Sequence, residues 1–399
     1  MSARIAIVSP KQPSSNPRMK KAAIALAEHG YTVHVCYAYN GEWADRADQL
    51  TFKAASWSHE RIGGHPILEP WKYFQTRLRR KIASVLGNEM GVLMPNKNDY
   101  LSALKKWQPD LVIGHNPGAL PMLHQWKQET GGKVLFDAED FHRAESYWTR
   151  VDKCHVMEKL ESQFIPILDG MSAASPLIGE AYRQVFPSQY VVTVNNAFPK
   201  DLLQREPTKM GGPLRLVWFS QVLGLDRGLD AFLQGMALIP HIPIQLTLIG
   251  LSTQEKIDTI LTAILSDVHS VLFEEPKPEP ELLQLLAEQE IGLALEKPEP
   301  RNRDICRTNK LYTYPLAGCH ILASHTAAQF QFLEEWPQTG QNIQLDKPDS
   351  IAQALDHAFH HREDLLGKRK QTWSLAKSRL NWETECQPLL DLVDQTLKY

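Results

Sequence analysis

The sequence predicts an α/β protein with two domains, each built on a parallel β-sheet covered by helices, followed by C-terminal helices. Three observations support this prediction. The chain has 399 residues, which is enough for two or three folding units. Short β-branched runs alternate with helical patterns along both halves, as parallel sheets require. Residues 199–212, which contain Pro and Gly, separate the halves and suit a domain boundary.

We therefore expect a first domain over residues 1–199 and a second over 200–370. A C-terminal helix over 371–399 could pack back on the first domain. Two consecutive α/β units also predict a cleft between the domains, which is a common position for a small-molecule site.

The first half begins with a βαβ unit. Residues 4–9 (RIAIVS) predict a strand, an Ala-rich helix then ends near Gly30, and residues 32–39 form the next strand. The loop between that strand and that helix contains no glycine, so the GxGxxG cradle of a dinucleotide site is missing. Further strands of this half are predicted at 110–115, 133–137, 170–174 and 190–194.

The second half repeats this plan without obvious sequence repetition. Its predicted strands are 214–219, 245–249, 268–273, 291–295 and 319–323. Its predicted helices include one from Gly228, one over 279–289 and one over 308–316, and residues 350–399 read as helices.

The overall charge excludes some classes of partner. Lys plus Arg number 43 and Asp plus Glu 46, a net charge of −3, so no global positive field exists to attract nucleic acid. The five cysteines are odd in number and widely spaced, which argues against a disulfide framework or a zinc site. With no leader and no membrane-spanning stretch, the chain is expected in the cytoplasm.

Residues 71–86 form a distinctive helical pattern, because five cations are mixed with aromatic and aliphatic residues. Such a helix could make peripheral contact with the cytoplasmic face of a membrane or face a lipid-linked substrate. The alternative is a surface helix whose apolar stripe packs on its own domain.

A cluster of charged residues lies between a predicted strand and a predicted helix at 295–310. Arg303 and Lys310 stand near the helix start, where the macrodipole disfavours cations unless an anion is bound. Arg227 lies in the loop after the strand predicted at 214–219. Together with Arg227, these side chains could hold a diphosphate, aided by free helix amides. The alternative is a solvated loop whose acids, among them Glu296, neutralise the cations.

Polar side chains also follow the strands of the first half. They are Asn16, Arg18, His115, Asn116, Asp137 and Glu139. In a parallel sheet the strand ends share one edge, so these residues are expected to meet there, where carboxylates could orient or deprotonate an acceptor hydroxyl. Taken one at a time, His115 could equally be a histidine at a strand end whose hydrogen bonds are satisfied. Asp137 could equally cap a loop.

The order of these segments resembles the GT-B glycosyltransferases, most closely the retaining family-4 group. Residues 308–318 (TNKLYTYPLAG), followed by Ala323 and Ser324, resemble the donor signature NKLFEYMAAG…AS. Weaker likenesses occur at 14–18, 110–121, 136–140, 172–178 and 194–196. The resemblance implies two Rossmann-like domains facing each other across a cleft. It also implies a hexosyltransferase of polysaccharide or glycoconjugate biosynthesis that uses a nucleoside-diphosphate sugar, with no cofactor and no metal.

The resemblance also implies roles for the candidate residues. Catalytic roles fall to Glu139, His115 and Asp137, donor diphosphate binding to Arg227, Arg303 and Lys310, donor nucleotide or sugar binding to Glu296, Asn302, Thr308, Asn309 and Thr313, and acceptor-side contacts to Asn16, Arg18 and Asn116. The acceptor is expected to be a glycan or lipid-linked.

Three positions depart from the pattern. Thr313 replaces a ribose-binding glutamate, Glu139 replaces a histidine, and Ser220-Gln221 lack the usual arginine. A nucleotide- or glycan-binding subunit without transferase activity is therefore an alternative, and a sugar-nucleotide epimerase is a weaker one.

Overall fold

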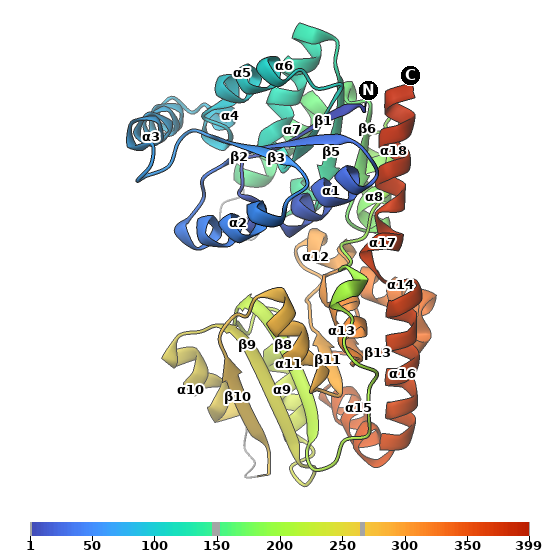
Figure 1. Ribbon diagram of the computed structural model, residues 1–399. Coiled ribbons are helices and arrows are strands. Elements are labelled where there is room, and N and C mark those ends of the chain that lie inside the picture. The colour runs from blue at the N-terminus through green and yellow to red at the C-terminus, as the bar shows by residue number, and fades with distance from the viewer. Residues whose placement is uncertain (1, 146–151, 264–267, 399) are drawn as a thin grey trace. The chain divides into compact units, whose positions relative to one another are not determined.

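The computed structural model describes residues 2–145, 152–263 and 268–398 (Figure 1). The chain divides into two compact units, Met1–Asn195 together with Cys386–Tyr399, and Asn196–Glu385. Each unit contains one parallel sheet with helices, which confirms the predicted α/β class.

The first unit contains a seven-stranded sheet in the order β3-β2-β1-β4-β5-β6-β7. Its strands are β1 (Arg4–Ser9), β2 (Thr32–Ala38), β3 (Ser58–Ile62), β4 (Leu111–His115), β5 (Lys133–Ala138), β6 (Gly170–Ala173) and β7 (Val191–Thr193). Its helices are α1 (Pro17–Glu28), α2 (Glu42–Ala54), α3 (Pro70–Val85), α4 (Glu89–Leu93), α5 (Lys97–Trp107), α6 (Leu120–Thr130), α7 (Asp152–Phe164), α8 (Pro176–Val185) and α18 (Gln387–Lys398). Short 3-10 turns lie at Pro13–Ser15, Pro117–Ala119, His142–Ala144 and Ile165–Ile167.

The second unit contains a six-stranded sheet in the order β10-β9-β8-β11-β12-β13. Its strands are β8 (Leu214–Val222), β9 (Ile244–Leu251), β10 (Ser270–Glu274), β11 (Ile291–Ala294), β12 (His320–Ser324) and β13 (Gly340–Ile343). Its helices are α9 (Leu229–Ala237), α10 (Gln254–Ala263), α11 (Glu279–Ala287), α12 (Arg301–Ile305), α13 (Lys310–Ala317), α14 (Ala327–Glu335), α15 (Pro348–His360), α16 (Arg362–Ser378) and α17 (Trp382–Glu385), with 3-10 turns at Lys200–Leu202 and Pro337–Thr339.

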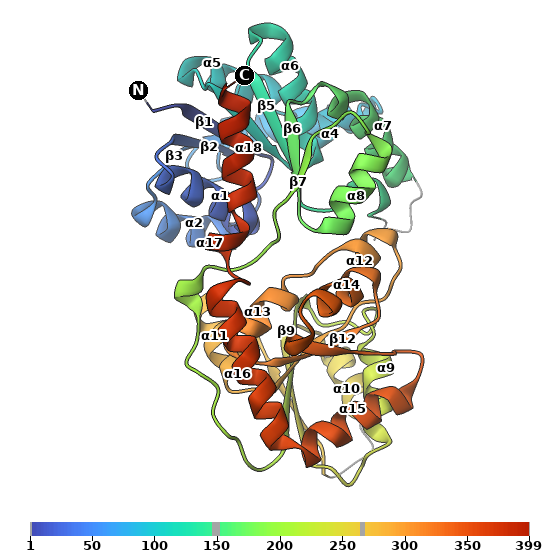
Figure 2. The same cartoon turned by 90° about the vertical axis from the view of Figure 1, so that its right-hand side faces the viewer.

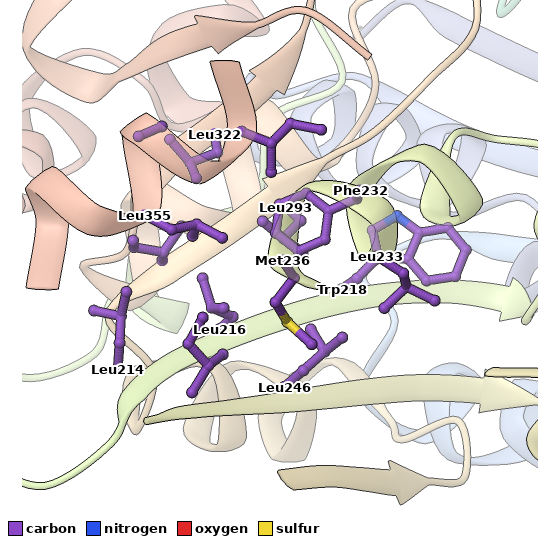
Figure 3. Close-up of a cluster of buried hydrophobic side chains, with 14 of the residues drawn as sticks. Leu214, Leu216, Trp218, Phe232, Leu233, Met236, Leu246, Leu293, Leu322 and Leu355 are labelled. Carbon is purple, nitrogen blue, oxygen red and sulfur yellow. The ribbon is translucent and has the colours of Figure 1, made fainter. Parts of the chain in front are cut away.

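Burial on both faces explains why the central strands are almost continuously apolar. All residues of β1 after Arg4 are buried, as are all of β4 and β11. In the second unit, side chains from β8, β9 and β11 pack against α9 and α15 in one apolar cluster (Figure 3). Parallel strands covered by helices on both faces require this composition.

The helices near the C-terminus belong to different units. α16 packs against α13 and β12 of the second unit, whereas α18 packs against α1, β6 and β7 of the first (Figure 2). The hydroxyl of Tyr31 donates a hydrogen bond to Asp394 of α18. The apolar face of α18, which includes Leu389 and Val393, is buried there.

The strand predictions missed one edge strand of each sheet. β3 (SHERI) and β13 (GQNI) lie at the edges of their sheets and contain few buried apolar residues. Each of these two strands is half solvated, and its sequence does not show the apolar run by which the other strands are recognised.

Candidate functional site

Both sheets have a topological switch point, where the strand order reverses. It lies between β1 and β4 in the first sheet and between β8 and β11 in the second. Loops leaving the carboxyl ends of two such strands diverge to opposite faces and leave a crevice, which is the usual ligand position in open α/β sheets. The candidate residues gather at these two places.

In the first unit, strand register brings three polar side chains together. His115 ends β4 and is paired with Asp137 on β5, and Asp137 is paired with Ser172 on β6. Asn16 and Arg18 come from the start of α1, which follows the loop after β1. The side chain of Asn16 caps this helix by accepting a hydrogen bond from the amide of Met19 at 3.1 Å.

Arg18 and Asp137 form a buried two-point ion pair. Nε of Arg18 donates to Oδ2 of Asp137 at 2.6 Å, and Nη2 donates to Oδ1 at 2.8 Å. Nη1 donates to the carbonyl of Val194 at 2.6 Å, and Ser172 donates to Asp137. Burial alone would raise the pKa of Asp137, but Arg18, with help from His115 and Ser172, lowers it to about 2. Asp137 is therefore an ionised anchor rather than a proton acceptor.

Glu139 is the most exposed acid of this cluster. One of its oxygens, Oε1, lies 3.2 Å from Nδ1 of His115 and accepts a hydrogen bond from Asn16. Its other oxygen accepts a hydrogen bond from Nδ2 of Asn116 at 3.3 Å. Burial would raise the pKa of Glu139, but the hydrogen bond and charge of His115 outweigh it and hold the pKa below its usual value.

His115 has one ring nitrogen engaged and one without a partner. Nδ1 lies 3.3 Å from Asp137 and 3.2 Å from Glu139, so it can donate to a carboxylate. Nε2 is buried and has no hydrogen-bond partner among the described residues. In the neutral form of the ring, with its proton on Nδ1, Nε2 is the atom that can accept a proton.

Asn116 follows β4 with a strained backbone, φ 62° and ψ 147°, in a region that is almost confined to glycine. The side chain is buried and lies 3.4 Å from the hydroxyl of Ser9. Holding this conformation costs about 1–3 kcal/mol. The contacts of Asn116 with Ser9 and Glu139 help to hold this conformation.

The carboxyl ends of β1, β2 and β3 open onto a cavity of about 110 Å³. Its lining includes Pro10, Tyr39 and Gly63 from the loops that follow these strands, and Tyr73 and Arg80 from α3. Pro10 follows Ser9 directly, so the cavity and the polar cluster share one loop of the sheet.

His115, Asp137 and Glu139 each place one ligand atom within 4.8 Å of the others, a spacing that a metal ion could bridge. The guanidinium of Arg18 already occupies both oxygens of Asp137, however. A divalent cation would have to displace or approach that positive group. The donor set therefore favours an ion-pair network over a metal centre.

In the second unit, Glu296 lies between two cations at the switch point. Nη1 of Arg227 donates to Oε1 of Glu296 at 2.7 Å, and Nζ of Lys310 is 3.9 Å from the same oxygen. Lys310 is buried beside the rings of Trp218 and Phe219. Burial lowers the pKa of Lys310 to about 8, Glu296 opposes this effect, and Arg227 adds to it.

This trio has two positive charges and one negative charge. Glu296 Oε2 is buried and has no hydrogen-bond partner among the described residues. The site thus presents an excess of positive charge beside an acceptor oxygen without a donor, an arrangement that suits an anionic ligand carrying hydroxyl groups.

Gly292 and Tyr314 fix α13, which carries Lys310 at its first turn. The Tyr314 ring lies against β11, where a Cβ on Gly292 would come within 2.3 Å of it. The Tyr314 hydroxyl donates to the carbonyl of Leu293 at 2.9 Å. Only glycine permits this close approach, which sets the helix start beside β8 and β11.

The other predicted donor residues lie around this trio without joining it. Nη2 of Arg303 lies 3.0 Å from the carboxylate of Asp226. Asn302 is buried in α12, and Asn309 is exposed and accepts a hydrogen bond from Asn196 at 2.7 Å. The hydroxyl of Thr308 has no partner among the described residues.

Thr313 is buried, and its hydroxyl donates to the carbonyl of Asn309 at 2.8 Å within α13. Arg307 lies in the charged segment 295–310. Its Nη2 donates to Oε2 of Glu335 at 2.7 Å, so Arg307 does not pair with the trio.

Sequence reasoning assigned no role to several contributors. Asp226 belongs to no recognisable motif. Its ion pair with Arg303 joins the loop after β8 to α12, which is distant in sequence. Ser172 carried a detectable signal, since it lies in the predicted strand at 170–174 and begins the stretch 172–178 that resembles the family pattern. Ser324 accepts a hydrogen bond from the amide of Glu296 at 2.8 Å and donates to Gln329 at 2.7 Å. This pair holds the loop that carries Glu296.

No family model and no curated protein matches the chain. Solved structures do match it over nearly the full length. A sucrose-phosphate synthase from Thermosynechococcus elongatus has a TM-score of 0.73 at 13% identity, covering 99% of both chains. HepE from Anabaena, in complex with UDP and glucose, has a TM-score of 0.69 at 14% identity, covering 98% of this chain and 100% of that chain. An α,α-trehalose 6-phosphate synthase from Burkholderia multivorans has a TM-score of 0.67 at 13% identity, covering 100% and 98%. The agreement in architecture with these enzymes shows that the chain has the GT-B fold of glycosyltransferases.

Proposed function

We propose that this protein transfers a sugar from a nucleoside-diphosphate sugar to a hydroxyl group of a glycan or lipid-linked acceptor. The observation that carries the proposal is the Arg227–Glu296–Lys310 trio, a largely buried site with excess positive charge at the switch point of the second sheet. Similar folds bind such donors, since HepE is described in complex with UDP-glucose.

In the proposed donor site, the diphosphate lies against Lys310 and Arg227, with Arg303 nearby. A bound anion would offset the burial of this ammonium and raise its pKa. The unpartnered Oε2 of Glu296 would accept a hydrogen bond from a ribose or sugar hydroxyl. Glu296 would thereby supply the contact that Thr313 cannot make.

In the proposed acceptor site, Glu139 and His115 bind the acceptor hydroxyl, and Asp137 holds Arg18 and His115 in place. With inversion of configuration, an acceptor hydroxyl bonded to Nε2 of His115 would pass its proton to that nitrogen, a contribution of about 10²–10⁴-fold. With retention of configuration, which we propose, the departing phosphate takes the proton and these residues position the hydroxyl.

We propose that the reaction needs no metal ion, because Lys310, Arg227 and the amides at the start of α13 stabilise the departing diphosphate. Transfer should continue in EDTA. Loss of transfer on chelation, restored by magnesium or manganese, would contradict this part of the proposal.

The primary test is a thermal-shift panel of UDP, GDP, CDP, ADP and dTDP. A bound nucleotide at about 100 times its Kd should stabilise the protein by about 2.7 kcal/mol. Lys310→Met should weaken that binding by about 30-fold to 1,000-fold, equivalent to roughly 2–4 kcal/mol. Lys256→Met, at an exposed position on α10, is the matched control and should bind as the parent does. Equal affinity of both variants would reject the donor site.

A binding subunit without transferase activity is the second candidate, favoured by Thr313, whose hydroxyl is bonded within α13. Slow release of free sugar from a sugar nucleotide in the absence of acceptor separates the two functions. Nucleotide binding with neither hydrolysis nor transfer would favour the binding subunit.

A further inference from the structure

We propose that residues 67–86, which comprise α3 and the loop before it, dock the protein on the surface of an anionic lipid bilayer. The proposal does not depend on sugar transfer. Among the described residues, no helix is long and apolar enough to cross a membrane, so the contact would be peripheral. Eight of the 19 exposed large apolar side chains of the described residues lie in this segment.

The apolar side chains of α3 form a single stripe. Trp71, Phe74, Leu78, Ile82 and Val85 are exposed by 68%, 53%, 44%, 49% and 79%. At 100° per residue, these positions fall within an arc of about 80°. The rings of Trp71 and Phe74 stack at 5.8 Å. A helix that packs on its own protein buries such a stripe. Because the stripe of α3 is exposed, we expect it to contact an external partner.

The opposite face of α3 anchors the helix to the first unit. Ala83 is buried, and Thr76 donates to the carbonyl of Gly63 at 2.8 Å. Tyr73 contacts Tyr39 edge to face at 5.8 Å. The stripe lies about 190° around the helix from this anchored face. Figure 1 shows α3 standing out from the other helices of its unit. The geometry therefore presents the apolar stripe outward.

The charges beside the stripe select the kind of partner. α3 contains five cations and no acid. Lys72 pairs with Glu69, and Arg79 pairs with Asp99. At 100° per residue, Arg77 and Lys81 flank the stripe, and neither makes an ion pair with the described residues. An amphipathic helix with Trp and Phe on one face and Lys and Arg beside it is suited to the interface of an anionic bilayer.

A second copy of this chain is a poorer occupant for the same surface. A symmetric pair of α3 stripes would bring two rows of cations together, and like charges at close range repel. An anionic bilayer removes this conflict, because each cation near its surface gains attraction to lipid headgroups.

The test is co-sedimentation of the full chain with vesicles of phosphatidylcholine alone and of phosphatidylcholine mixed with phosphatidylglycerol. We expect binding to the mixed vesicles that weakens between about 0.1 M and about 1 M salt, since screening shortens the reach of the charges. Trp71→Ser combined with Leu78→Ser should lower the affinity at least tenfold. The matched control, Leu238→Ser combined with Leu251→Ser, alters exposed apolar residues of the second unit and should bind unchanged.

The charge contribution is tested by Arg77→Gln combined with Lys81→Gln, which should weaken binding to mixed vesicles about 30-fold. The control is Lys53→Gln combined with Lys106→Gln, at exposed positions outside the segment. Melting midpoints should match the parent, because all the altered side chains are exposed.

Three results would overturn the proposal. They are an absence of sedimentation with mixed vesicles, equal binding by the Trp71 and Leu78 variant, and a parent dimer in solution that this variant converts to monomer. The last result would assign the stripe to a second copy of the chain.

Discussion

Replacing Asp137 by Asn tests whether the Arg18–Asp137 pair organises the first cluster. The substitution keeps the size of the side chain but removes the charge that balances a buried guanidinium. Arg18 would then remain in the interior with only the carbonyl of Val194 and neutral groups as direct partners. Leaving one member of a buried ion pair alone costs about 3–5 kcal/mol.

The pKa of Asp137 provides an independent estimate of the same interaction. Its fall from 3.8 to about 2 corresponds to stability on the order of 2 kcal/mol, since each unit of pKa is worth roughly 1.4 kcal/mol. Because the folded value is the lower one, this stability is complete above the unfolded value and is lost as the pH falls through about 2. The difference between parent and variant should therefore narrow below about pH 4.

The assay is urea unfolding at pH 7, followed by tryptophan fluorescence. Asp99→Asn is the matched control, because Arg79 and Asp99 lie 2.6 Å apart but are about half exposed. That substitution should cost at most about 1 kcal/mol. If Asp137→Asn loses no more stability than Asp99→Asn, burial of the pair does not have the energetic role assigned to it.

Three further predictions concern the second cluster and the backbone. Affinity for a nucleoside diphosphate should fall as the pH rises through about 8, where Lys310 loses its charge, and calorimetry on Lys310→Arg should show a flatter profile. Gly292→Ala should cost about 1–3 kcal/mol because its Cβ would strike the Tyr314 ring. Gly367→Ala, where the new Cβ meets nothing, should gain about 0.4–1 kcal/mol, and equal melting midpoints for the two would contradict this reasoning. Asn116→Gly should be more stable than Asn116→Ala by about 1–3 kcal/mol in urea unfolding, since only glycine relieves the positive φ; equal stabilities would show that the backbone is unstrained.

The central strands and the long helices could be predicted from local pattern. Residues 4–9 and 291–294 are apolar throughout because helices cover both faces of the sheet, and that requirement is visible in the sequence. The edge strands β3 and β13 could not be predicted in this way, since half-solvated pairing leaves no apolar run.

Helix starts were less certain than strands. The predicted helix at 308–316 begins at Lys310 and ends at Ala317 in the structure. Its position depends on the contact between Tyr314 and Gly292, which are far apart in the chain.

The sequence by itself determined the fold class and the six polar residues that gather at the edge of the first sheet. Parallel strands bring their carboxyl ends to one edge, so residues that follow strands meet whatever the details of packing. Only the tertiary structure decided which charges are paired. It places Glu296 between Arg227 and Lys310, directs Arg307 to Glu335, and leaves the stripe of α3 exposed. Ion pairs and burial depend on the distances between loops. No local sequence pattern encodes these distances, because the packing of separate helices places each member of a pair.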